Sequence, residues 1–401
     1  MSLLHLVRRG LDVASRVDGG SDDNGPEPPP PHPLALLVLF MTAMGFFLLL
    51  FGINYTYGHL LPTLCMVESP ETSAYLPVDS LAPSDDETAA PPAYEEAEGE
   101  GAYNAAGAAE TAAAPKPNDD VELHLMQNKP VTASLRASIL HLRRRAGYGS
   151  RFRGLTLYLV WNMGVGIVTS MLAPIFAYNR ISVGLSAIVA QVAAATIHMT
   201  WIHIVISDPS PKRWYQRIPS IRTWPKMAPA VALWALATQI VAVLPVLVCG
   251  SFGSLKHMKD PEYDPDRRDL YAIGAQGLFG MLLVLLLYIL IQIPATVTMV
   301  RVAASMLPDE DETIVSFDRT FGGKTTPTII GGSGKIGLVE AWRSFTWASR
   351  VRLLKLVAKV ALIVLSVWIA MLLTLTIEAH VLLGESLGQV LKGVHGAAGP
   401  R

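Results

Sequence analysis

The sequence predicts an all-α, multi-pass membrane protein with about six transmembrane helices. Hydrophobic residues make up 51% of the chain and charged residues only 16%, whereas soluble domains usually carry about 25% charged residues. The charge deficit is concentrated in apolar stretches of roughly 20 residues, the length that a helix needs to cross a bilayer core of ~30 Å. Arginine and lysine are concentrated in alternate loops between these stretches, as the positive-inside rule describes.

Residues 1–33 form a tail ahead of the first span. Its first part, MSLLHLVRRGLDVASRV, places Leu3, Leu4 and Val7 on one helical face, with arginines beside it. This pattern favours a short helix on the membrane surface, with a mitochondrial presequence as the alternative. Residues 18–33 are rich in Pro, Gly and Asp, so polyproline II or disorder is expected there.

The first span is predicted at residues 34–53, and residues 54–120 are predicted to be a disordered acidic linker. Two tyrosines, Tyr55 and Tyr57, follow the span, as interfacial aromatic residues often do. From Glu68 to Asp120 the chain is rich in Ala, Pro, Glu and Asp. Such a segment buries too little apolar surface to offset the entropy lost on ordering.

Five further spans are predicted beyond a basic segment at 121–154, which we expect to lie on the membrane surface. They cover residues 155–176, 181–206, 227–248, 273–299 and 357–377. The turn between the first two of these is short, so they should form an antiparallel hairpin. Residues 300–356 form a long basic loop and residues 378–401 a C-terminal tail.

Loop charges predict the orientation and the cellular setting. The arginines and lysines before 155, between 206 and 227 and between 299 and 357 place those segments in the cytosol. Both termini then lie on the lumenal side and the acidic linker is cytosolic. The expected location is an endomembrane or the plasma membrane, with a mitochondrial membrane as the alternative.

Polar residues inside spans are the strongest functional signal in such a chain. A candidate intramembrane path is formed by Asn162, Gln191, His198 and Gln276. No Asp or Glu lies within a predicted span, and Glu378 follows the sixth span directly. This pattern disfavours an ion-coupled pump and leaves a small-solute facilitator or channel as one hypothesis. Interhelical hydrogen bonding and packing are the competing interpretation of the same residues.

No catalytic, cofactor or metal site is predicted. The sequence has no GxSxG, HExxH or CxxC, and its two cysteines cannot form a disulfide framework. The run Gly331–Lys335 resembles a P-loop, but Ile336 stands where Ser or Thr is needed, so a turn is expected. The net charge of −1 predicts no attraction to nucleic acid. We therefore interpret the chain as non-enzymatic, with the lipid bilayer as its first partner and an undefined oligomeric state.

One short motif is specific. Pro91, Pro92 and Tyr94, in the sequence PPAY, match the PPxY ligand of WW domains. A preformed polyproline turn binds an aromatic groove at low entropy cost, and the tyrosine fills a second pocket. WW domains commonly belong to ubiquitin ligases, and Lys116 and Lys129 lie nearby as acceptors. The leading hypothesis is an adaptor for, or substrate of, a WW-domain ubiquitin ligase.

Three segments carry a resemblance to a known group of proteins. They are PVTASLRASILHLRRRAGYGSRFRGL, RIPSIRTWPKMAPAVALWALATQIV and IPATVTMVRVAASMLPDEDETIVSFDRTFGGK. They resemble fungal multi-pass membrane proteins that bear the name ubiquitin carrier protein or ubiquitin conjugating enzyme, over most of residues 120–377. The name implies ubiquitin transfer through a thiolate, which needs a soluble α/β domain of about 150 residues. No soluble stretch here is both long and apolar enough, so ubiquitin transfer ranks behind the adaptor and the facilitator.

Overall fold

The computed structural model describes residues 33–69, 130–176, 179–252, 267–325 and 331–383. The chain divides into two units, Met1–Glu68 with Val131–Arg401, and Ser69–Pro130. All the contacts described below lie within the first unit. Its described residues are mostly helical, and their only β pairing is an isolated bridge between Ser207 and Thr313.

The helices confirm the predicted class, an all-α membrane protein with several spans. Among the described residues, five helices are long and apolar enough to cross a membrane. They are Pro33–Val67, Tyr148–Ile175, Ile221–Ser251, Tyr271–Ser305 and Trp347–Leu382. A sixth span is present if Arg180–Ala193 and Ala195–Ile206, which bend by 62° between them, are counted as one.

The first span is longer than the sequence predicts. It runs through α2 (Pro33–Ile53), a π-helical turn η1 (Asn54–Leu60) and α3 (Leu61–Val67). Residues 54–67, which the sequence assigns to the linker, are therefore helical, and Leu60, Leu61 and Leu64 are at most 1% exposed. The helix continues because these apolar residues pack in the core of the bundle. The rest of the predicted linker lies outside the described residues.

The predicted hairpin consists of α5 (Leu155–Leu172), the 3₁₀ turn η5 (Ala173–Phe176) and α6 (Arg180–Ala193). A capping box starts α6: Asn179 Oδ1 accepts the N–H of Ser182 at 2.8 Å, and Ser182 Oγ accepts the N–H of Asn179 at 2.8 Å. The third predicted span is broken at Ala194, where α7 (Ala195–Ile206) begins. The indole Nε1 of Trp224 donates to the Val192 carbonyl at 2.8 Å, a group that the break removes from the regular helical ladder.

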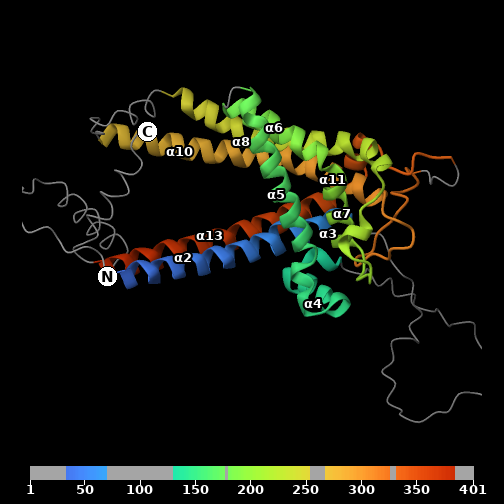
Figure 1. The fold of residues 1–401 in the computed structure, drawn as a ribbon, viewed down its shortest axis with the longest axis horizontal. Coiled ribbons are helices and arrows are strands. Elements are labelled where there is room, and N and C mark those ends of the chain that lie inside the picture. Colours follow the sequence, from blue (N-terminus) through green and yellow to red (C-terminus); the bar gives the residue numbers. More distant parts are fainter. Residues whose placement is uncertain (1–32, 70–129, 177–178, 253–266, 326–330, 384–401) are drawn as a thin grey trace, which may run out of the picture. The chain divides into compact units, whose positions relative to one another are not determined.

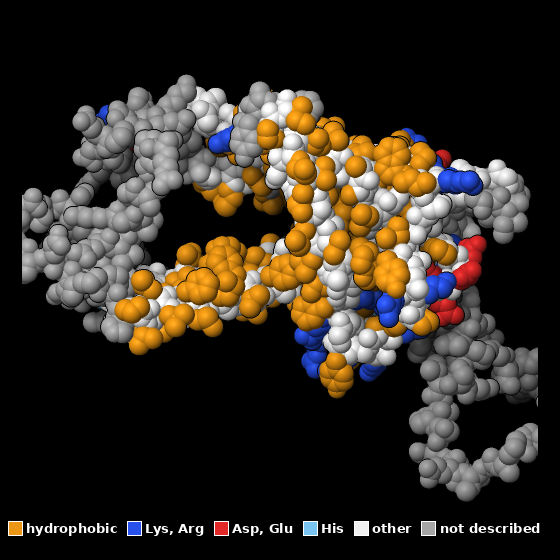
Figure 2. Space-filling view, viewed as in Figure 1, with side chains coloured by type: hydrophobic (Ala, Val, Ile, Leu, Met, Phe, Trp, Pro, Cys, Tyr) orange, Lys and Arg blue, Asp and Glu red, His pale blue; other side chains and the backbone are white. Residues whose placement is uncertain are grey.

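The remaining helical elements follow in chain order. They are α8 (Trp224–Ser251), α10 (Arg267–Leu287), the π-helical turn η8 (Tyr288–Gln292), α11 (Ile293–Ser305), the short helix α12 (Leu338–Arg343) and α13 (Trp347–Leu383). Helices α2 and α13 lie side by side (Figure 1), with Phe47 and Trp368 in edge contact at 6.4 Å. Their outer faces are covered with apolar side chains (Figure 2), among them Leu48 and Ile377, each more than 60% exposed. Such faces suit contact with lipid tails.

The buried side chain of Arg301 connects α11 to the end of α3 and to the residue that follows α12. Arg301 on α11 is 6% exposed and donates to the Met66 carbonyl and to Ser344 Oγ, both at 3.0 Å. Its guanidinium also lies 4.7 Å from the Phe321 ring centre, within cation–π range. Helix α4 (Leu135–Ala146) lies in the predicted basic segment and carries exposed arginines, which form a blue patch in Figure 2.

Candidate functional site

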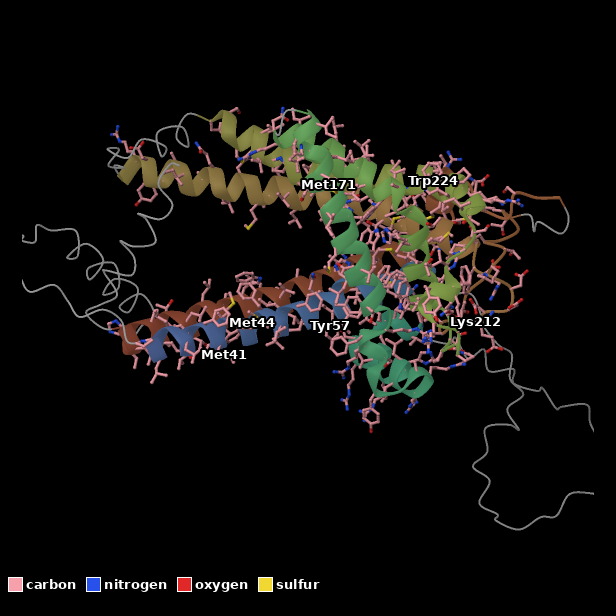
Figure 3. The ribbon with its side chains drawn as sticks, in the orientation of Figure 1. Met41, Met44, Tyr57, Met171, Lys212 and Trp224 are labelled. Atoms are coloured by element: carbon pink, nitrogen blue, oxygen red, sulfur yellow. The ribbon has the colours of Figure 1, made fainter. Side chains whose placement is uncertain are left out.

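Three irregularities interrupt the spanning helices. The π-helical turns η1 and η8 each widen a span, and the break at Ala194 bends a third by 62°. π-Helical turns are rare and frequently occur at functional sites. In Figure 3, Tyr57 marks the η1 turn at the point where α2 passes into the helical bundle. Residues from η1, α7 and η8 all line the same cavity, which makes this cavity the candidate site.

The cavity has a volume of about 560 Å³ and lies among η1, α3, α7, α8, α10, η8, α11 and α13. This volume is within the ~300–1,000 Å³ typical of ligand pockets. Its lining is mostly apolar, and no Asp, Glu, Lys or Arg is among the described residues that form it. The principal polar lining residues are His59, Thr63, His198, Thr238, Gln292 and Thr296. The site is therefore suited to an uncharged molecule.

Aromatic rings build one wall. His198 stands among three tryptophans, with ring centres 4.2 Å from Trp161, 4.9 Å from Trp234 and 5.8 Å from Trp201. Tyr158 extends the cluster, 5.7 Å from Trp201, and its hydroxyl forms a 3.0 Å hydrogen bond with His59 Nε2. Such packing fixes the rotamers of the two histidines, so their ring nitrogens are held in place.

Two buried polar atoms of the cavity-lining residues have no hydrogen-bond partner among the described residues. They are His198 Nδ1 and Gln292 Oε1. Gln292 is held by its other atom, since Nε2 donates to Thr238 Oγ1 at 3.1 Å. Buried polar atoms in proteins are almost always paired, and leaving one unpaired costs about 1–3 kcal/mol. Both residues line the cavity, where a bound molecule can supply the missing partner.

Of the four residues of the path predicted from the sequence, only His198 lines the cavity. Asn162 is exposed and donates to the Tyr158 carbonyl of its own helix at 2.8 Å. Gln191 lies on α6, and Gln276 lies on α10, where its carbonyl oxygen is 3.8 Å from Cys249 Sγ.

Several residues that line the cavity could not be predicted from the sequence. His59 and Thr63 follow the predicted first span and so fall in the predicted linker, and Thr238 does not stand out from its apolar neighbours. A usable signal is nevertheless present. After Gly58 the chain returns to LLPTLCMV, an apolar stretch that is untypical of a solvated linker and that the structure shows as buried α3.

Three other kinds of functional site remain: the PPAY motif, the two cysteines and a group of side chains that could bind a metal ion. Pro91, Pro92 and Tyr94 lie outside the described residues. Cys65 is fully buried in α3, and Cys249 is partly buried at the end of α8. Among the described residues, no group of three or more His, Cys, Asp or Glu side chains is arranged to hold a metal ion. The cavity is thus the clearest site that the structure offers.

The fold defines a multi-pass α-helical membrane protein, and its helix bundle encloses a cavity of about 560 Å³. No protein family, curated protein or solved structure matches this chain.

Proposed function

We propose that the protein is a facilitator that binds a small, uncharged, largely apolar molecule in the cavity between η1, α7, η8 and α13. The observation that carries this proposal is a pair of buried atoms, His198 Nδ1 and Gln292 Oε1, that have no hydrogen-bond partner among the described residues and belong to residues lining the cavity. A ligand hydroxyl can donate to Gln292 Oε1, and it can donate to or accept from His198 Nδ1 according to the tautomer of that ring, while Trp201 and Trp234 would contact the apolar part of the ligand.

Because no carboxylate, lysine or arginine is among the described residues that line the cavity, we expect its ligand to be uncharged. A charged molecule would need an opposite charge in this apolar setting, since an uncompensated ion in a membrane costs several kcal/mol. None of the described lining residues is acidic or basic apart from the histidines. An uncharged solute or a neutral lipid-like molecule meets no such penalty.

Co-purification tests this proposal whatever the identity of the ligand. The full chain is extracted in mild detergent, and native mass spectrometry together with solvent extraction identifies any neutral adduct. We expect an adduct on the wild type that is strongly reduced in the double variant Thr238→Val/Gln292→Leu. Asn162→Leu is the matched control, because Asn162 lies off the cavity. Flux of the extracted molecule through reconstituted vesicles then tests the facilitator role.

The proposal fails if the wild type carries no adduct, or if the double variant and the wild type carry it equally.

Recruitment of a WW-domain ubiquitin ligase through Pro91, Pro92 and Tyr94 is a second candidate function. One observation favours it. Glu68 and Val131, which flank the segment that holds this motif, lie beside Arg352, at the end of the bundle that the basic loops predict to be cytosolic. A pull-down of WW-domain ligases from detergent extracts should recover them with the wild-type chain and lose them with Tyr94→Ala. Equal recovery by the two chains would contradict this function.

A further inference from the structure

A second hollow, of about 340 Å³, lies between the α4–α5 connection and the loop that follows α7. It is separate from the cavity of the proposed function, and no residue lines both. Three cationic side chains line it: Arg153, Lys212 and Arg217. No Asp or Glu is among the described residues that line it. Lys212 is labelled in Figure 3, on the loop beyond α7.

The two arginines are held in place with donors left over. Arg153 uses Nε to donate to the Ile204 carbonyl, and no hydrogen bond from its terminal nitrogens occurs among the described residues. Arg217 uses Nη2 alone, for Ser207 Oγ at 2.7 Å and Asp311 Oδ2 at 3.1 Å. The Arg217 side chain is only 7% exposed, so its position is fixed by the protein. Guanidinium groups held in place with spare N–H donors are the donors that proteins most often use to bind phosphate.

A neutral donor completes the lining. Ser150 is 3% exposed, and its hydroxyl has no hydrogen-bond partner among the described residues. It comes from the 3₁₀ turn η4 (Tyr148–Phe152), which follows the arginine-rich end of α4. A buried hydroxyl without a partner, beside two arginines, is an independent sign that an acceptor group belongs in this hollow.

The neighbouring residues indicate which kind of phosphate compound the hollow would bind. The hollow lies at the start of the α5 span, where Trp214 and Tyr215 are 37% and 48% exposed and pack edge to face at 5.8 Å. Exposed aromatic pairs next to basic residues are typical of the headgroup layer of a membrane. We propose that the hollow binds the phosphate of an anionic lipid headgroup, and that a soluble phosphate compound is not its ligand.

The test uses the full chain in a neutral maltoside detergent. It is titrated with short-chain phosphatidylinositol 4-phosphate and, separately, with short-chain phosphatidylcholine, inorganic phosphate and inositol 1,4-bisphosphate, with binding counted by native mass spectrometry. We expect one copy of the anionic lipid to bind and the other three probes to bind far more weakly. Lys212→Gln should weaken lipid binding roughly fivefold, since one cation near a membrane surface contributes ~1 kcal/mol. Arg217→Gln should weaken it about tenfold or more.

Two further variants separate a built site from general charge attraction. Ser150→Ala removes no charge and should still weaken lipid binding. Lys324→Gln removes an exposed cation that does not line the hollow, and should leave binding unchanged. The proposal is overturned if Lys324→Gln and Lys212→Gln weaken binding equally. It is also overturned if inositol bisphosphate or inorganic phosphate binds as tightly as the lipid, which would identify a soluble ligand.

Discussion

The side-chain carboxylate of Glu68 accepts the backbone N–H of Val131 at 2.6 Å. The same carboxylate accepts the N–H of Thr132 at 3.2 Å and forms an ion pair with Arg352, with 3.6 Å between Nη1 and Oε2. Glu68 is 2% exposed. One buried acid thus holds Val131 and Thr132 beside the end of α3, and its ion pair with Arg352 connects both segments to α13.

Glu68→Ala should destabilise the protein severely. The substitution leaves the Arg352 cation and two backbone N–H groups without their partner, and breaking a buried ion pair typically costs about 3–5 kcal/mol. Unfolding of the purified protein by titration with dodecyl sulfate measures the loss. Glu310→Gln is the matched control, because Glu310 pairs with Lys212 at a site where its side chain is 83% exposed. A similar loss in both variants would contradict the anchoring role of Glu68.

Trp224→Phe should destabilise the broken span. The substitution keeps an aromatic ring but removes the 2.8 Å hydrogen bond to the Val192 carbonyl beside the break. The expected cost is about 1–2 kcal/mol, measured by the same titration. Trp347→Phe serves for comparison, since Trp347 is 73% exposed and its loss should change little. If the two variants are equally stable, the indole does not support the break.

Gly280→Ala should be harmful, whereas Gly277→Ala should be harmless. A methyl group at 280 would lie 2.9 Å from Cys249 Sγ, but one at 277 meets nothing within 4 Å. Overpacking of this kind costs about 1–3 kcal/mol. Adding Cys249→Ala should restore most of the loss, so the double variant measures the coupling between α8 and α10. Without such recovery, the contact does not set the spacing of these helices.

Glu378 should react with a hydrophobic carbodiimide. Its Oε1 accepts the Thr42 hydroxyl at 3.0 Å, and its Oε2 is buried without a partner among the described residues. Thr42 lies in the middle of the apolar α2, so this carboxyl group faces a largely apolar setting. Peptide mass spectrometry should find the adduct on Glu378, and Glu378→Gln should abolish it. Adducts confined to exposed acids such as Glu310 would contradict the prediction.

Local patterns explain why much of the fold can be predicted. The sequence predicts a hairpin at 155–176 and 181–206, and the structure has helical turns from Leu155 to Phe176 and again from Arg180. Hydropathy is a local property, and a tight polar turn between two apolar runs leaves few arrangements. Glu378 shows the limit. The sequence puts it just beyond the sixth span, but α13 continues to Leu383, and Glu378 accepts a hydrogen bond from Thr42 of α2 that local sequence does not indicate.

The candidate site is less predictable, since it depends on contacts between distant segments. Gln292 and Thr238 are bonded side chain to side chain across two helices, and nothing in either local sequence indicates that pairing. A π-helical turn such as η8 has no composition that distinguishes it from its α-helical neighbours. Glu68 resembles the first residue of the acidic linker, because its partners Val131 and Arg352 come much later in the sequence.

The shared anchor of Glu68 joins the two ends of the bundle sequence that flank residues 70–129. Because the carboxylate already joins the flanking backbone, we expect the contacts among the described bundle residues to persist when residues 70–129 are replaced with another sequence. The closure entropy changes by only ~0.6 kcal/mol for each doubling of loop length. A fluorescent protein or an affinity tag can therefore be spliced between Glu68 and Val131, which makes this junction the natural site for building a reporter from the molecule.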